Sequence, residues 1–164
     1  MQIFLAVVSL ILLALQSPAY ALTPDQLAAE LGVATEMRPR IERFLKKHHV
    51  KHPARFAVLI LKQEPDPEQQ KMWAAMLVKE RGERGHISPA NCVGPWQVNY
   101  RVWPDLCRGK DITDPRANLK LARAIFKFHL QKSGQVWGPG GAVDCYSGLA
   151  SGYATDVQRL MGGI

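Results

Sequence analysis

Apolar residues recur at helical spacing in the segment that ends at Glu80. Trp73, Met76 and Leu77 are followed one turn later by Glu80, which gives positions i, i+3, i+4 and i+7. This spacing puts the four side chains on one face of an α-helix, with the carboxylate at the end of the apolar stripe. A carboxyl group partly removed from water holds its proton to a higher pH, as a general acid must. Glu80 is therefore the candidate acid, although an ordinary carboxylate paired with Lys or Arg also fits this position.

The rest of the chain also has helical periodicity, interrupted by proline and glycine. Gly94 and Pro95 suit the cap and first position of a further helix, which carries Gln97 and ends at Trp103-Pro104. No convincing alternation of apolar and polar residues predicts strands. The expected fold class is all-α, with a single core and little or no sheet. The other expected helices run from Thr23 to about Gly32, Ala34 to Lys47, Pro53 to Glu64, Asp114 to about Lys132, Ala142 to Ser147 and Tyr153 to Met161.

The amino terminus has the pattern of an export signal. A run of thirteen residues that are apolar except for Ser9, Ile3 to Leu15, precedes the small residues Ala19 and Ala21. The run is shorter than the ~20 residues that span a bilayer. We therefore expect residues 1–21 to be a signal peptide, with an uncleaved anchor as the alternative. The remaining chain is expected to be periplasmic or secreted, without stable insertion in the membrane.

The charge of the chain points to an anionic partner. All 21 Lys and Arg and all 14 Asp and Glu follow residue 21, so this part carries the full formal charge of +7. A bacterial cell wall, a membrane surface and nucleic acid are all anionic, but no basic block is interleaved with aromatic residues, so we expect no nucleic-acid partner.

His48, His49 and His52 stand among lysines that repel cations, which predicts a solvated turn. We expect no metal and no cofactor.

Three cysteines suit an oxidising compartment, but their odd number leaves at least one unpaired within the chain. We favour a disulfide between Cys92 and Cys107, which would brace the loop around Gly94. Cys145 would then be a small apolar residue in a helix. The chain has no Cys-x-x-Cys pair, so neither a zinc site nor a dithiol redox site is indicated.

Three ordered motifs resemble the soluble lytic transglycosylase domain, a goose-type-lysozyme-like family that cleaves peptidoglycan. The first is a helix ending in Glu, a Ser-Pro loop and Gly-x-x-Gln; the second is Asp-Pro-x-x-Asn; the third is Cys-Tyr-Ser-Gly with a later Tyr. Together they cover roughly residues 54–161, and three in order are far more specific than one. The matching residues are Glu80, Ser88, Gly94, Gln97, Asp114, Pro115, Asn118, Tyr146, Ser147 and Tyr153.

After the signal peptide (1–21) we expect an N-terminal helical extension (22–53), and the resemblance implies a lysozyme-like catalytic domain (54–164). We expect a monomer. The resemblance also implies cleavage of the β-1,4 bond between N-acetylmuramic acid and N-acetylglucosamine in peptidoglycan glycan strands, leaving 1,6-anhydro ends. Glu80 would be the single acid and base. A lysozyme-like muramidase and a non-catalytic wall-binding module are the alternatives. The residues expected to contact substrate are Ser88, Gln97, Tyr146, Ser147 and Tyr153, the last also bonding to Glu80.

Two other glutamates are rivals to Glu80. Glu64 also closes an apolar helix, but it lies thirty residues before Gly94, whereas Glu80 lies fourteen before it, close to the spacing in the family. Glu83 lies just beyond Glu80, and Lys79 at i−4 gives it a simple surface role.

Overall fold

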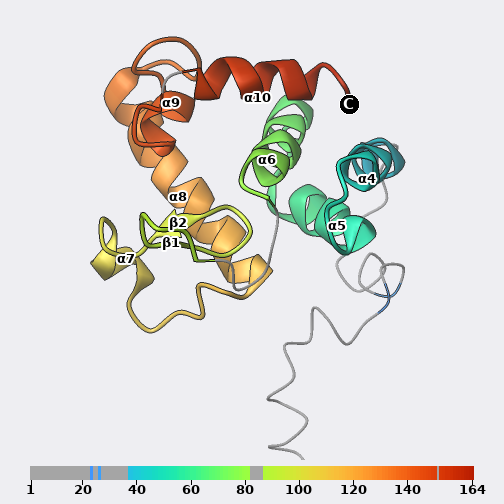
Figure 1. Ribbon diagram of the computed structural model, residues 1–164, viewed down its shortest axis with the longest axis horizontal. Helices are drawn as coiled ribbons and strands as arrows, with labels where there is room; N and C mark the ends of the chain where they lie inside the picture. The colour runs from blue at the N-terminus through green and yellow to red at the C-terminus, as the bar shows by residue number, and fades with distance from the viewer. Residues whose placement is uncertain (1–22, 24–25, 27–36, 82–86, 151) are drawn as a thin grey trace, which may run out of the picture.

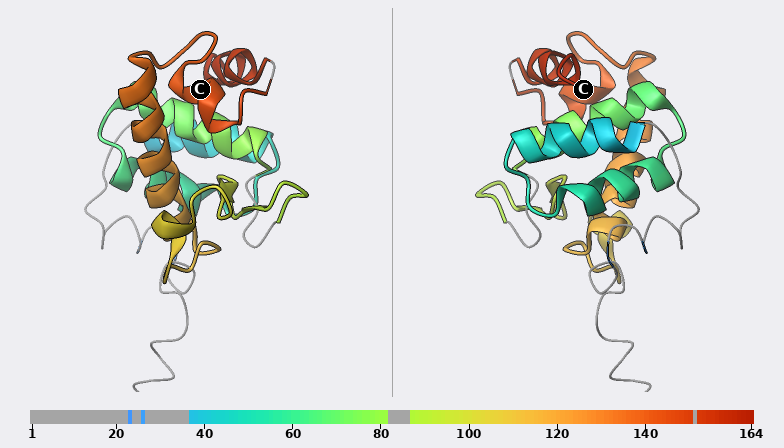
Figure 2. Two further views of the ribbon diagram at one scale, coloured as in Figure 1. Left: turned by 90° about the vertical axis from the view of Figure 1, so that its left-hand side faces the viewer. Right: turned by 90° about the vertical axis from the view of Figure 1, so that its right-hand side faces the viewer.

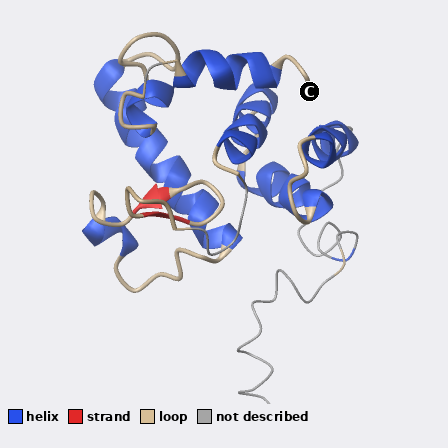
Figure 3. Ribbon diagram, viewed as in Figure 1, coloured by secondary structure: helices blue, strands red, loops and turns tan. Residues whose placement is uncertain are grey.

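The computed structural model describes Thr23, Gln26 and residues 37–81, 87–150 and 152–164. The expected signal peptide, most of the expected helix from Thr23 to Gly32, and Glu83 lie outside the described residues. The described part is mostly helical with one small hairpin, which confirms the all-α prediction (Figure 3). Its elements are α4 (Met37–Lys47), α5 (Pro53–Gln63), α6 (Pro67–Lys79), β1 (Cys92–Val93), β2 (Val98–Asn99), α7 (Pro104–Cys107), α8 (Pro115–Ser133), α9 (Ala142–Tyr146) and α10 (Tyr153–Met161).

Helix α4 lies against α5 at one side of the molecule (Figure 1). It buries Ile41, Phe44 and Leu45 and turns its charged residues outward. The helix ends in a Schellman motif, in which the N–H of Val50 donates to Leu45 O at 3.0 Å and that of His49 donates to Lys46 O at 3.0 Å. The solvated turn predicted for the histidine run is thus present, and His49 takes the left-handed conformation there (φ 58°).

Helix α6 runs through the centre of the core, and Asp66 caps its amino terminus by accepting from two backbone N–H groups. Trp73, in its middle, is fully buried and packs edge-on against Phe126 of α8 at 5.6 Å between ring centroids. The indole of Trp96 donates to Trp73 O at 3.0 Å, so the hairpin is bonded directly to this helix. The core is therefore built around α6, whose last turn leads to Glu80.

Helix α8 forms the long wall on the opposite side from α4, as the side views also show (Figure 2). It begins where the sequence predicts, because the Asp114 side chain accepts from Ala117 N at 2.8 Å and Pro115 fits the first helical position. It ends at Gly134, which is left-handed (φ 69°). No helix in the described ranges is both long enough and apolar enough to cross a bilayer.

The helix expected from Gly94 is wrong: residues 94–97 are the turn of a hairpin that pairs Val93 with Val98. Both Gly94 (φ 80°) and Gln97 (φ 49°) are left-handed, a conformation that a right-handed helix cannot contain. Asn118 of α8 holds this turn with three bonds of 2.8 Å: it accepts from Trp96 N and donates to the carbonyls of Val93 and Ile112. A Cβ on Gly94 would lie 2.5 Å from Asn118 Nδ2, so this close approach requires glycine.

Three further helices, α7, α9 and α10, lie after the hairpin in the sequence. Pro104 does not end a helix as predicted but opens the short α7, again as a first-turn proline. Helices α9 and α10 have the predicted positions, and between them Gly148 (φ 73°) is the left-handed residue of a second Schellman motif. Helix α10 packs across the end of α6, which brings Tyr153 to Glu80 (Figure 1).

Candidate active site

Glu80 is the residue that caps the carboxyl end of α6, and its side chain is half-buried. Its backbone N–H still donates to Met76 O at 2.8 Å, so the helix fixes the position of its Cα. The next residue, Arg81, is left-handed (φ 69°), which ends the helix abruptly, and its side chain is exposed. The predicted position of Glu80, at the end of the helix and partly removed from water, is confirmed.

Tyr153 donates its hydroxyl to Glu80 Oε1 at 2.6 Å. Beside this bond, Lys79 of α6 pairs with Asp156 of α10, and the pair lowers the pKa of Asp156. These two contacts join the end of α6 to the start of α10. Burial, and then the negative charge of Glu80, raise the pKa of Tyr153 well above its usual value, so the phenol stays protonated and donates.

Tyr146 of α9 lies next to this pair. Its hydroxyl donates to Trp96 O at 2.6 Å, and its ring meets that of Trp73 edge-on at 6.3 Å. Burial raises the pKa of Tyr146 well above its usual value, and the charge of Glu80 raises it further. Two protonated phenols therefore face one carboxylate, and each phenol is fixed by a hydrogen bond.

A pocket of about 300 Å³ opens beside these residues, between the hairpin, α8 and α9. Its described lining contains no Asp, Glu, Lys or Arg. Glu80 and Tyr153 do not line the pocket. Tyr146 and Cys92 do line it, and the charge of Glu80 raises the pKa of both. The polar and aromatic lining residues include Cys92, Gln97, Asn99, Trp103, His129, Cys145, Tyr146 and Ser147.

Three of the residues expected to contact substrate, Gln97, Tyr146 and Ser147, line this pocket together, although they come from two distant segments. Gln97 donates through Nε2 to Gly94 O at 2.9 Å, and Ser147 donates to Asp144 O at 2.8 Å. Ser88 does not line the pocket: its hydroxyl accepts from Cys92 N at 3.2 Å and supports the hairpin.

The disulfide expected between Cys92 and Cys107 is wrong, because all three cysteines, which lie in the described ranges, are free thiols. Cys107 is buried in the apolar core at the end of α7, whereas Cys92 stands at the pocket, so the two face different surroundings. Burial raises the pKa of both thiols, and the nearby Glu80 raises that of Cys92 further. Cys92 and Cys145 instead line the same pocket.

Sequence reasoning missed some of the lining. His129 packs with its ring 5.7 Å from that of Trp103, and it also lines the pocket. Burial and the charge of Lys132 lower its pKa, so it is neutral at pH 7. Trp103 and Asn99 line the pocket as well, and no local pattern in the sequence marks Asn99.

Glu64 has a structural role. Its side chain is 4% exposed, and Oε2 accepts from Arg123 Nε at 3.1 Å and from Trp73 Nε1 at 3.3 Å. It lines none of the hollows described here. The rival to Glu80 is therefore an acceptor that joins α5, α6 and α8 in the interior.

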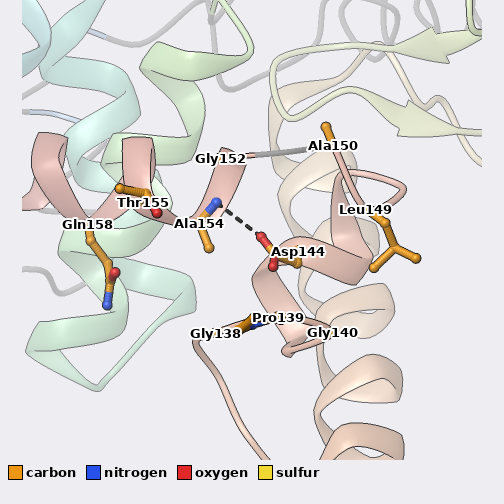
Figure 4. Close-up of a pocket in the computed structure, with 10 residues that line it drawn as sticks. All are labelled: Gly138, Pro139, Gly140, Asp144, Leu149, Ala150, Gly152, Ala154, Thr155 and Gln158. Carbon is orange, nitrogen blue, oxygen red and sulfur yellow. Dashed lines mark hydrogen bonds between the residues drawn. The ribbon is translucent and has the colours of Figure 1, made fainter.

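A second hollow, of about 500 Å³, lies between the loop before α9 and helix α10 (Figure 4). Asp144 is the single ionisable residue in its described lining, and its Oδ1 accepts from Ala154 N at 3.2 Å (Figure 4). That bond holds the start of α10 beside Glu80. The carboxylate is thus already used in positioning the helix that carries Tyr153.

Among the described residues, no group of three or more His, Cys, Asp or Glu lies close enough together to hold a metal ion. Comparison of the chain with known protein families, with curated proteins and with solved structures gives no match.

Proposed function

We propose that this protein is a lysozyme-like lytic transglycosylase that cuts peptidoglycan glycan strands with Glu80 as its acid and base. The observation that carries the proposal is the bond of 2.6 Å from the buried Tyr153 hydroxyl to Glu80 Oε1 beside the pocket. This bond fixes the orientation of the carboxyl group. A protonated Glu80 can then donate to the glycosidic oxygen of a bound sugar.

The absence of a second carboxylate at the described pocket favours a single-glutamate scheme. Two-carboxylate glycosidases place their acidic groups roughly 5–9.5 Å apart across the scissile bond. Here Glu80 is the one carboxylate in the described chain whose charge shifts the pKa of Cys92, Tyr146 and Tyr153. The acetamido oxygen of N-acetylmuramic acid would therefore attack C1 of its own ring as Glu80 protonates the leaving oxygen.

The second step regenerates the carboxyl group. The Glu80 carboxylate takes the proton of the muramyl 6-hydroxyl, whose oxygen then bonds to C1 and releases the acetamido oxygen. The product has a 1,6-anhydro ring, and Glu80 regains the proton that it gave to the leaving oxygen. Gln97, Ser147 and Tyr146 line the pocket from the hairpin and from α9, so their polar groups suit sugar hydroxyl and acetamido groups.

The test is mass analysis of the soluble products formed from peptidoglycan sacculi by the wild-type protein and by Glu80→Gln. We expect anhydromuropeptides from the wild type and at least about 100-fold less from the variant, since a general acid contributes on the order of 10²–10⁴ in rate. Glu68→Gln, an exposed change at the other end of α6, is the matched control and keeps full activity.

Other products would change the conclusion. Muropeptides with reducing ends would make water the acceptor and the protein a muramidase. Sedimentation with the wall without release of any product would indicate a binding module. Full activity in Glu80→Gln would contradict the role given to Glu80.

A further inference from the structure

The positive charge of this protein is concentrated in one segment. Between Met37 and Arg55 the chain has seven Lys or Arg and one Glu, which is a net charge of +6. The whole chain has 21 Lys or Arg and 14 Asp or Glu, which is a net charge of +7. The remainder of the chain is therefore almost neutral. In the fold this segment is α4, the turn after it and the first residues of α5.

The basic side chains of α4 gather on its outer face. Arg40, Arg43, Lys46 and Lys47 are exposed, while Ile41, Phe44 and Leu45 face the core. Arg40 and Arg43 each donate through Nε to a backbone carbonyl, and none of the four makes an ion pair with a described carboxylate side chain. We call these four residues the α4 basic face.

We infer that the α4 basic face is a docking surface for a bilayer rich in anionic phospholipid. The four cations lie on the convex outside of a helix, and none of them lines a hollow described here. A single flexible strand is held best in a basic groove with aromatic side chains on which to stack. A broad convex array without exposed aromatic residues instead matches a plane of lipid phosphates, to which each Lys or Arg near the surface adds about 1 kcal/mol.

The position of this face also suits a membrane. Helix α4 is on the opposite side of the molecule from α8 and the hairpin, which border the pocket (Figures 1 and 2). The exposed large apolar residues, Ile87, Val102, Phe128 and Leu149, all belong to segments other than α4. Docking would therefore be electrostatic, without insertion, and would leave the pocket facing away from the lipid.

The experiment is co-sedimentation of the protein, purified after export, with vesicles of phosphatidylglycerol and phosphatidylcholine in equal parts. The double variant Lys46→Gln/Lys47→Gln removes two cations from the α4 basic face. We expect it to lower the partition coefficient about 30-fold, because each residue contributes about 1 kcal/mol to binding. The matched control, Lys120→Gln/Lys127→Gln, removes the same charge from the exposed surface of α8 and leaves binding nearly unchanged. All variants share one amino terminus, so differences between them report the helix surfaces.

We expect binding of the wild type to the anionic vesicles, little binding to vesicles of phosphatidylcholine alone, and loss of binding as salt is raised. Three results would overturn the inference. The wild type could fail to bind, or both double variants could lose affinity equally, which would assign binding to net charge. Binding to soluble polyphosphate but not to vesicles would identify a phosphate polymer as the partner. The assay contains no peptidoglycan, so its outcome is separate from that of the proposed cleavage.

Discussion

The bond between Tyr153 and Glu80 can be tested through stability, without any assumption about substrate. Tyr153→Phe removes only the hydroxyl, which donates to Glu80 Oε1 at 2.6 Å from a side chain that is 5% exposed. A hydrogen bond to an ionised group contributes about 1.5–3 kcal/mol. Because Glu80 is only half-buried, we take the lower part of this range and expect a loss of about 2 kcal/mol at pH 7.

The charge on Glu80 accounts for part of this loss of stability. Measuring the cost of Tyr153→Phe again in the Glu80→Gln variant separates the contribution of the charge from that of the neutral hydrogen bond. In Glu80→Gln the amide oxygen still accepts from the phenol, but a neutral bond is worth about 1 kcal/mol. Urea unfolding of the four proteins of this cycle, followed by circular dichroism, should give a coupling of about 1 kcal/mol. Tyr146→Phe is the control, because its hydroxyl donates to the neutral carbonyl of Trp96, and it should cost nearly the same in both backgrounds.

Equal costs for Tyr153→Phe with Glu80 and with Gln at this position would refute the reasoning. That result would mean that Glu80 does not hold its charge against the phenol in the folded protein. The Tyr153 hydroxyl would then orient a neutral carboxyl group, and the energetic argument for a charged Glu80 would fail.

Three further results are expected. Because the pKa of Tyr146 and that of Tyr153 are raised in the folded state, the unfolded chain loses these protons first near pH 10, and urea unfolding should show stability falling above this pH by up to about 2.7 kcal/mol per pH unit; a flat profile would contradict this. His49→Gly should raise the unfolding free energy by about 1 kcal/mol, since glycine adopts the left-handed C′ conformation without strain, and an unchanged urea midpoint would argue against the Schellman end. Asn118→Ala should cost about 3 kcal/mol or more in the same assay, because a fully buried side chain loses its three hydrogen bonds, whereas a cost under about 1 kcal/mol would mean that the hairpin is held by other contacts.

The helices could be predicted because their signals are local. Asp114-Pro115 marks the start of α8, and the stripe that begins with Trp73 predicts that α6 ends at Glu80. The half-buried position of Glu80 at a helix end was predicted from four residues that span about two helical turns. Tyr146 was also placed correctly, since α9 is short and ends before Gly148.

The hairpin could not be predicted in this way. Gly94-Pro95 is equally compatible with a helix start and with a tight turn, and the choice depends on Asn118, which lies 22 residues after Trp96. The prediction of a disulfide was wrong for a related reason. The sequence shows how far apart Cys92 and Cys107 are along the chain, but it does not show that Cys107, at the end of α7, is buried in the core. Both errors concern contacts between segments that are far apart in sequence.

The polar contacts of the core also fix the geometry of the site. Glu64 accepts from the indole of Trp73, the carbonyl of Trp73 accepts from the indole of Trp96, and the carbonyl of Trp96 accepts from Tyr146. Because Trp73 lies on the helix that ends in Glu80, this chain of bonds sets the position of Tyr146 relative to Glu80. Buried networks of this kind specify one arrangement of the elements they join. A substitution at Glu64, which does not line the pocket, should therefore disturb the site through the position of Tyr146, with Glu80 itself still in place at the end of α6.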